Sequence, residues 1–205
     1  YEVDPASWKG ARDRSWGIRP VGEREPAGIG IEDIVAGKHG FYHHWIPLQL
    51  DRGMIKVMYD ADYEGKVTVE EATFVPGFSQ SGETLKYGTP QFEVDYISGT
   101  REIAGVQTTL PNPNGKDLLI KSIPQRTVYL AAGSGYLPTE DWGHGYYKGP
   151  LVVEGLTFDM STQEKRSQYA ILNETLCRFE LNTGEVSYLS LIHSVRCRLN
   201  VRGPP

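Results

Sequence analysis

The chain has 205 residues, of which 21 are basic and 26 are acidic, so that its formal net charge is −5. This balance, without any basic run, excludes a broad electrostatic attraction to nucleic acid or to an anionic membrane. No apolar run approaches the roughly 20 residues that a membrane-spanning helix needs, and the polar start YEVDPASWKG lacks the form of a signal peptide. We therefore expect no nucleic-acid partner and no membrane span.

The first element in chain order is the stretch GARDRSWGIRP, residues 10–20. If it is a regular strand, Arg12, Arg14 and Trp16 share one face and Asp13 lies on the other. Two interpretations of Asp13 stay open. It is ion-paired to an arginine of a neighbouring strand, which lowers the pKa of its carboxyl group, or it lies in an apolar cavity, where desolvation raises that pKa and lets it protonate a substrate.

A long loop at residues 21–40 precedes the clearest predicted hairpin, YHHWIPLQLDRGMIKVMYD, whose turn is expected near Arg52 and Gly53. One face of this hairpin is apolar throughout, as in an antiparallel sheet that is covered on one side. Pro47 cannot donate to a ladder, so it predicts an edge or a bulge. The expected pairs are Leu50 with Ile55, Leu48 with Val57 and Ile46 with Tyr59, and the other face carries His43, Trp45, Gln49, Lys56 and Asp60.

The adjacent histidines of this hairpin point to opposite faces of their strand, which places His44 on the apolar face. Two interpretations of His44 stay open: a buried histidine bonded to a backbone carbonyl, or a proton carrier that also orients a ligand. His39 and His43 are four residues apart, a spacing that aligns metal ligands on a helix but not across a loop and a strand. We therefore expect no metal site.

Further strands are predicted where aromatic and β-branched runs are separated by Gly, Pro, Asn and Asp. The stretch LPNPNGKD, residues 110–117, predicts a turn. A short helix is predicted within residues 161–173, with Ser161 or Thr162 as its N-cap. The expected strands are residues 65–75, 90–99, 101–110, 116–123, 126–133 and 149–160.

The stretch EDWGHGYYKGPLVVEG, residues 140–155, combines aromatic side chains, three glycines before a strand-like run, and His144. In one interpretation the glycines form a turn and the aromatic rings cover the end of a barrel. In the other, Trp142, His144 and Tyr147 lie at the mouth of a cavity that takes an apolar ligand with one oxygen. Both interpretations stay open.

A second hairpin is predicted at LCRFELNTGEVSYLSLI, residues 176–192, with its turn at Thr183 and Gly184. In this register Cys197 lies seven positions beyond the partner of Cys177, roughly 23 Å away. We therefore expect no disulfide, and two free thiols fit the reducing cytoplasm. The expected pairs are Leu181 with Val186, Phe179 with Tyr188 and Cys177 with Ser190.

About nine strands, a single short helix and no βαβ rhythm indicate an all-β, antiparallel barrel with one short helix, or alternatively a β-sandwich. No cofactor is expected, because AGIGIEDI lacks the third glycine and the preceding strand of a dinucleotide site. The chain also has no glycine loop that ends in Gly-Lys-Ser or Gly-Lys-Thr.

Three segments in the same order, GARDRSWGIRP, FYHHWIPLQLDRGMIKVMYDAD and WGHGYYKGPLVVEG, resemble the lipocalin-like double-barrel proteins related to carotenoid 1,2-hydratases, and in particular a bacterial branch of that group. The resemblance implies a calycin-like barrel that acts on apolar substrates without a cofactor. It maps the motif acid to Asp13 and the cation-stabilising aromatic residue to Trp16, with Arg14 where relatives commonly have histidine. It also implies a junction segment at 1–40, a barrel at 41–205 and a missing N-terminal barrel.

These patterns together predict binding of an apolar isoprenoid-, steroid- or polyketide-like molecule, with or without cofactor-free hydratase, isomerase or cyclase chemistry. The alternatives are a carrier of hydrophobic ligands without turnover and a structural partner domain of a two-barrel protein. The candidate catalytic residues are Asp13 and His44, and the candidate ligand-binding residues are Trp16, Trp45, Tyr59, His144 and Tyr147.

Overall fold

The structure is a computed structural model, and it describes most of the chain from the first predicted hairpin onward. It describes residues 2, 4, 42–62, 64–100, 102–135, 139–143, 146–170 and 173–196, with side chains described only up to residue 187 within the last range. The predicted strand at 10–20 and the loop at 21–40 lie outside these residues.

The described part of the chain consists of β-strands with one short helix, so the all-β prediction is confirmed. All recorded strand pairs are antiparallel, and the strands form a single sheet in the order β4-β3-β2-β1-β9-β8-β7-β6-β5. The elements are β1 (Tyr42–Leu50), β2 (Gly53–Ala61), β3 (Val67–Pro76), β4 (Leu85–Lys86), β5 (Gln91–Tyr96), β6 (Ile103–Leu110), β7 (Leu118–Tyr129), α2 (Gln163–Ser167), β8 (Asn173–Leu181) and β9 (Val186–Arg196).

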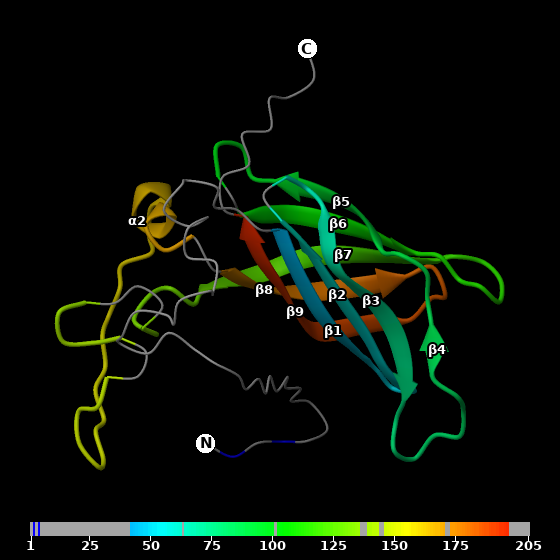
Figure 1. The fold of residues 1–205 in the computed structure, drawn as a ribbon, viewed down its shortest axis with the longest axis horizontal. Helices are drawn as coiled ribbons and strands as arrows, with labels where there is room; N and C mark the ends of the chain where they lie inside the picture. The colour runs from blue at the N-terminus through cyan, green and yellow to red at the C-terminus, as the bar shows by residue number, and fades with distance from the viewer. Residues whose placement is uncertain are drawn as a thin grey trace, which may run out of the picture.

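The connection between β4 and β5 shows that this sheet is rolled up (Figure 1). The two strands stand at opposite ends of the sheet order, yet only residues 87–90 join them. A chain of that length reaches at most about 18 Å, whereas nine flat strands would span roughly 38 Å. The two edges of the sheet must therefore lie near each other, and the backbone N–H of Gly88 donates to the carbonyl of Pro111 at 2.7 Å beside this crossing.

Side chains from strands that are far apart in the strand order meet inside the roll. The ring of Phe92 on β5 lies 4.6 Å from the ring of His44 on β1 and 5.3 Å from that of Tyr59 on β2. Among the described residues no ladder joins β4 to β5, so hydrogen bonds do not close the roll. The architecture thus combines the single rolled sheet of a barrel with the open edges and facing layers of a sandwich.

The interior of the rolled sheet is filled by alternate residues of its strands, as a sheet covered on one face requires. Burial of these side chains supplies most of the stabilisation of the fold. The buried cluster comprises Ile46, Leu48, Ile55, Val57, Ala72, Ile103, Val106, Leu110, Leu118, Ile120, Cys177, Phe179 and Leu181.

The first hairpin forms as predicted, but its register is shifted by two residues. Leu48 pairs with Ile55 and Leu50 with Gly53, so the turn consists of Asp51 and Arg52. Gly53 is the first residue of the returning strand. A Cβ at its position would lie 2.3 Å from the carbonyl oxygen of Val75, so glycine is needed there. A shift of two residues keeps every side chain on its predicted face.

The ladder from β1 to β9 ends at Trp45, two positions before Pro47. A proline without an N–H can lie beyond that point without interrupting the ladder. The predicted edge at Pro47 is wrong, because β1 lies between β2 and β9 in the sheet, and Pro47 is paired with Lys56 of β2 beyond the end of the ladder to β9.

The second hairpin has the predicted register only at its far end. Cys177 pairs with Ser190 as expected, but a bulge then sets Phe179 opposite Ser187 and Glu180 opposite Val186. The bulge allows a three-residue turn that ends at Gly184, whose φ of 89° suits glycine. Cys177 is a free buried thiol whose pKa burial raises to about 12, and Cys197 lies outside the described residues.

Four other predicted elements differ from the prediction or are seen in more detail. The strands expected at 116–123 and 126–133 form the single strand β7, with an irregularity after Pro124. The strand expected at 149–160 is wrong, because these residues form no strand. The predicted helix is α2, where the Thr162 side chain caps the N-terminus by accepting from the backbone N–H of Lys165.

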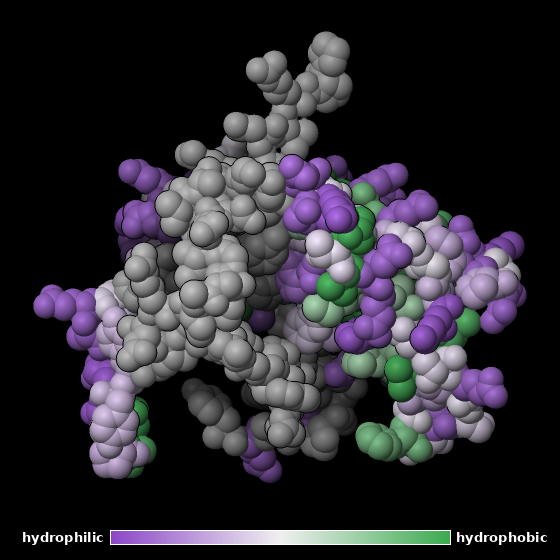
Figure 2. Space-filling model, in the orientation of Figure 1, coloured by the Kyte–Doolittle hydropathy of each residue, from purple (hydrophilic) through white to green (hydrophobic). Residues whose placement is uncertain are grey.

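The face of the described part that Figure 2 shows is largely hydrophilic, with hydrophobic residues scattered among polar ones. No helix among the described residues is long and apolar enough to cross a membrane.

Candidate functional site

One cross-strand row inside the roll is polar, in contrast to the apolar rows beside it. Antiparallel partners share a face, so the pairing places the described side chains of this row on the inner face of their strands, and Ser194 belongs to the row through its strand pairing alone. The neighbouring rows hold Ile46 with Val57 and Leu48 with Ile55. The polar row runs through Tyr129, Asn173, Ser194, His44, Tyr59 and Glu70.

His44 is the centre of this row. Its side chain is 0 % exposed, and its ring lies 4.4 Å from the ring of Tyr42 and 4.6 Å from that of Phe92. Within the described residues neither ring nitrogen has a hydrogen-bond partner. Desolvation, and to a lesser degree the neighbouring His43, lowers the pKa of His44 to about 3. The imidazole is therefore neutral near pH 7 and offers one donor and one acceptor.

Further polar groups of the inner wall lie next to His44. Thr108 pairs directly with Phe92, whose ring contacts His44, and Ser122 is a diagonal neighbour of Thr108 on the adjacent strand. Thr108 and Ser122 are each 2 % exposed, and Asn173 is 4 % exposed. Their side-chain oxygens also have no hydrogen-bond partner among the described residues. An unpaired buried polar atom costs about 1–3 kcal/mol, so four such residues on the inner face of one sheet are unusual for a packed core.

The two ends of the rolled sheet differ in their contacts. At the polar end the inward-facing rings of Tyr42, Tyr59 and Phe92 are half-buried. At the other end Phe74 and Tyr87 are half-buried as well, and the turns are joined by Arg52, which donates to both carboxylate oxygens of Glu185 at 2.8 and 3.1 Å. An ion pair thus joins the turns at that end, whereas aromatic rings surround His44 at the polar end.

The two sequence neighbours of His44, His43 and Trp45, lie on the outer face of the sheet. His43 is bonded to Asp60 there, as alternation predicts. Trp45 lies on the same outer face, half-buried, opposite Met58. The structure therefore brings His44 and Tyr59 together but leaves Trp45 on the other side of the sheet.

A second hollow lies in the long connection between β7 and β8, which extends beyond the strands together with α2 (Figure 1). Its volume is about 800 Å³, and aromatic side chains of the predicted cavity mouth line it, Tyr147 among them. The connection is fixed to the sheet where Arg166 of α2 donates to Glu102 at 2.8 Å. Burial and a hydrogen bond to the same carboxylate raise the pKa of Tyr129 to about 12.

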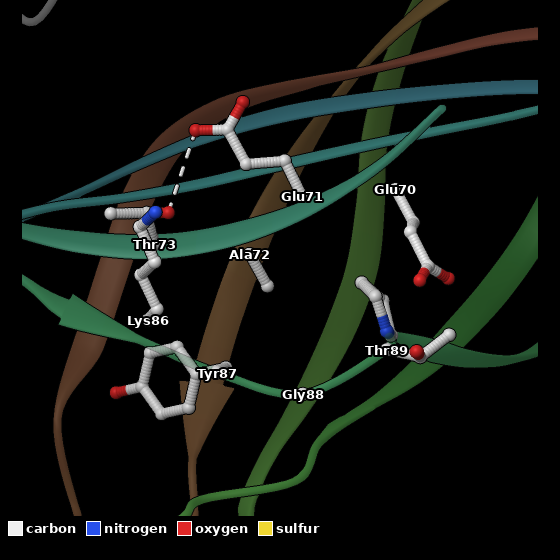
Figure 3. Close-up of a pocket in the computed structure, with 9 residues that line it drawn as sticks. Glu70, Glu71, Ala72, Thr73, Lys86, Tyr87, Gly88 and Thr89 are labelled. Carbon is white, nitrogen blue, oxygen red and sulfur yellow. Dashed lines mark hydrogen bonds between the residues drawn. The ribbon is translucent and has the colours of Figure 1, made fainter. Parts of the chain in front are cut away.

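A third hollow, of about 210 Å³, opens where β3 separates from the connection at 87–90 (Figure 3). Glu71 accepts from Thr73 at 3.4 Å, whereas Glu70 is directed toward Thr89. Because Glu70 ends the polar row and is exposed, the inner row reaches solvent at this opening.

Several predicted site residues cannot be placed. Asp13, Trp16 and His144 lie outside the described residues, so their roles stay predictions. Sequence reasoning missed Phe92 as a neighbour of His44, and Thr108 as the strand partner of Phe92. The strands that hold these two residues are predicted, and alternation places both side chains on the inner face. No pattern of nearby residues in the sequence indicates which strand lies opposite β1.

Comparison with known proteins gives a family but no function. No curated protein and no solved structure matches the sequence significantly. A family model matches residues 1–185, which is most of the chain and includes His43 and His44, the aromatic stretch and the rolled sheet up to the second hairpin. The chain belongs to the family of unknown function DUF8625.

Proposed function

We propose that the protein binds an uncharged, largely apolar small molecule at the polar end of the rolled sheet, with a hydroxyl or carbonyl group of the ligand on His44. The observation that carries the proposal is the fully buried imidazole whose two nitrogens have no partner in the described part of the chain. A bound ligand that donates or accepts a hydrogen bond there recovers the cost of burying these groups.

The surroundings of His44 indicate the character of the ligand. The rings of Tyr42, Tyr59 and Phe92 offer apolar surface, and their partial exposure leaves part of that surface accessible at the polar end. Thr108 and Ser122 add hydroxyl groups but no charge. A charged ligand would lose its hydration without gaining an opposite charge, so an uncharged one is favoured.

The low pKa of His44 favours binding over proton transfer. A group with a pKa of about 3 holds almost no proton near pH 7 and is also a weak base. The proposed role of His44 is therefore to orient the ligand. A hydratase, isomerase or cyclase reaction would need another acid, for which Asp13 stays the candidate that the family resemblance suggests.

Binding can be tested with all-trans-retinol, which has an apolar body and one hydroxyl group, through quenching of tryptophan fluorescence. We expect saturable binding of retinol, and weaker binding of all-trans-retinoate, which has a similar body but a carboxylate. The variant His44→Phe keeps a ring but removes both nitrogens, and should weaken retinol binding about 3- to 10-fold, as loss of one hydrogen bond implies.

Two further variants make this test specific. His44→Gln retains a donor and an acceptor and should bind retinol more tightly than His44→Phe does. His43→Phe changes the neighbouring histidine on the outer face and should leave binding unchanged. Equal affinity of wild type and His44→Phe, or equal affinity for retinol and retinoate, would contradict the proposal.

A further inference from the structure

The hollow between β7 and β8 is separate from the interior of the rolled sheet and has its own chemistry. It is formed by a segment whose aromatic and charged residues serve no strand pairing. Its volume of about 800 Å³ falls in the range of small-molecule sites. Its lining includes Trp142, Tyr146, Tyr147, Leu156 and Phe158, together with Asp141, Lys148 and Glu154.

The floor of this pocket is held in place by hydrogen bonds and close packing. The indole N–H of Trp142 donates to the carbonyl of Gly133 at 3.0 Å. The backbone carbonyl of Trp142 accepts from the N–H of Thr139 at 2.7 Å. A Cβ at Gly133 would lie 2.9 Å from the ring of Phe158, so the two are in close contact. A binding surface fixed in this way loses little conformational entropy when a ligand binds.

One wall of the pocket is apolar and exposed. The side chain of Tyr147 is 84 % exposed and that of Leu156 is 69 % exposed, and both line the pocket. Exposed aromatic and aliphatic side chains that gather around a hollow are typical of ligand sites. A flat ligand that stacks on Trp142 would cover this wall.

The charges around the pocket select among flat ligands. The ammonium group of Lys148 lies 2.6 Å from a carboxylate oxygen of Glu154 and 3.9 Å from one of Asp141. It also lies 5.9 Å from the centre of the Trp142 ring system. Two carboxylates thus face one ammonium group, and the excess of negative charge disfavours an anion and favours a cation near an aromatic face.

We propose that this pocket is a second binding site, which takes a flat aromatic compound with a positively charged amino group. The aromatic part stacks on Trp142 and is covered by Tyr147, and the amino group pairs with Asp141 or Glu154. The proposal does not depend on ligand binding inside the rolled sheet, because no residue of the polar row lines this pocket.

The test compares three indoles of similar shape and different charge: tryptamine, a cation; indole, which is neutral; and indole-3-acetate, an anion. Isothermal titration calorimetry on the whole chain should show saturable binding of tryptamine, weaker binding of indole and at least tenfold weaker binding of indole-3-acetate. Trp142→Ala should weaken tryptamine binding at least tenfold, as loss of a stacking surface implies. Phe78→Ala, at a fully exposed ring outside the pocket, should leave it unchanged.

A charge variant separates a specific site from a merely apolar surface. Glu154→Gln removes the nearer carboxylate from Lys148 and should weaken tryptamine while strengthening indole-3-acetate, each about threefold or more. Tyr147→Ala changes an exposed side chain that the fold does not need, and should weaken all three indoles. Failure of tryptamine to bind up to millimolar concentration, or an order of affinities that Glu154→Gln does not change, would overturn the proposal.

Discussion

His44 shows how the environment of one side chain sets its chemistry. In water an imidazole titrates near pH 6.5, but inside the rolled sheet desolvation holds the pKa of His44 at about 3. The group therefore stays neutral over the whole physiological range, and its value to the protein is a donor and an acceptor without charge. Its neighbours in the polar row offer the same kind of uncharged contact.

This lowered pKa makes a prediction for the pH dependence of stability. Below pH 6.5 the unfolded chain takes up a proton at His44, whereas the folded chain does so only near pH 3. The stabilisation is thus complete above pH 6.5 and declines as the pH falls toward the folded pKa. Between pH 6 and pH 4 this residue should lower the free energy of unfolding by up to about 1.4 kcal/mol per pH unit.

The measurement is urea unfolding of wild type and His44→Phe across that range of pH. The difference between their free energies of unfolding should shift in favour of the variant as the pH falls. A difference that stays constant from pH 6 to pH 4 would mean that His44 is not buried in its neutral form.

Turns and bulges decide the register of the strands at the scale of elements. In the first hairpin, Gly53 has a φ of 154° and lies against the backbone of β3, where a Cβ would be 2.3 Å from the carbonyl oxygen of Val75. Only glycine permits this approach, and the close contact helps to set the turn at Asp51 and Arg52. In the second hairpin, a bulge near Phe179 sets the register.

Replacement of this glycine tests the importance of the close approach. Gly53→Ala should lower the free energy of unfolding by about 2 kcal/mol or more, because strained backbone and steric overlap add together. Gly115→Ala is the matched control, since nothing lies within 4 Å of the added Cβ and the φ of Gly115 is not positive. Thermal unfolding should show a fall of Tm by about 5 °C or more for Gly53→Ala and little change for the control. Equal stability of the two variants would contradict this account of the register.

At the scale of the whole molecule, the structure separates a rolled sheet with a packed interior from a long connection outside it. The sheet buries its apolar side chains across strands that are distant in sequence. Residues 149–160 have large exposed side chains, among them Leu151 at 86 % and Val153 at 90 %. Their backbone enters no strand ladder among the described residues. Apart from Phe158, which packs against Gly133, this segment has few packing contacts with other described residues and should open at little cost in free energy.

Limited proteolysis with chymotrypsin should therefore separate the two parts. Among the described residues, the first cuts are expected between residues 146 and 157, after Tyr147, Leu151 or Leu156, because their backbone is accessible to the protease. The fragments should stay together, since the strands on both sides are held by the sheet. Earlier cutting within β1, β2 or β6 would show that the sheet is the less stable part.

The failed strand prediction at residues 149–160 has a physical explanation at this scale. Alternation of apolar residues is a local pattern that predicts a strand. The strand forms only where one of its faces is covered and a partner strand pairs with it. The rolled sheet already has nine strands among the described residues, and this segment lies in a connection outside it. A strong local preference for strand is therefore not realised, because no neighbouring strand edge pairs with it.

The sequence by itself determined the all-β class, both hairpins, the cap of the short helix and the inward position of His44, because each follows from alternation or from turn and cap residues a few positions apart. Only the tertiary structure decided that Phe92, the strand partner of Thr108, lies beside His44, and that the aromatic stretch forms a pocket outside the sheet. The physical reason is that neighbours across the interior depend on strand order and on the curvature of the whole sheet. Strand order and sheet curvature depend on packing among all the strands, so no single segment of the sequence predicts them.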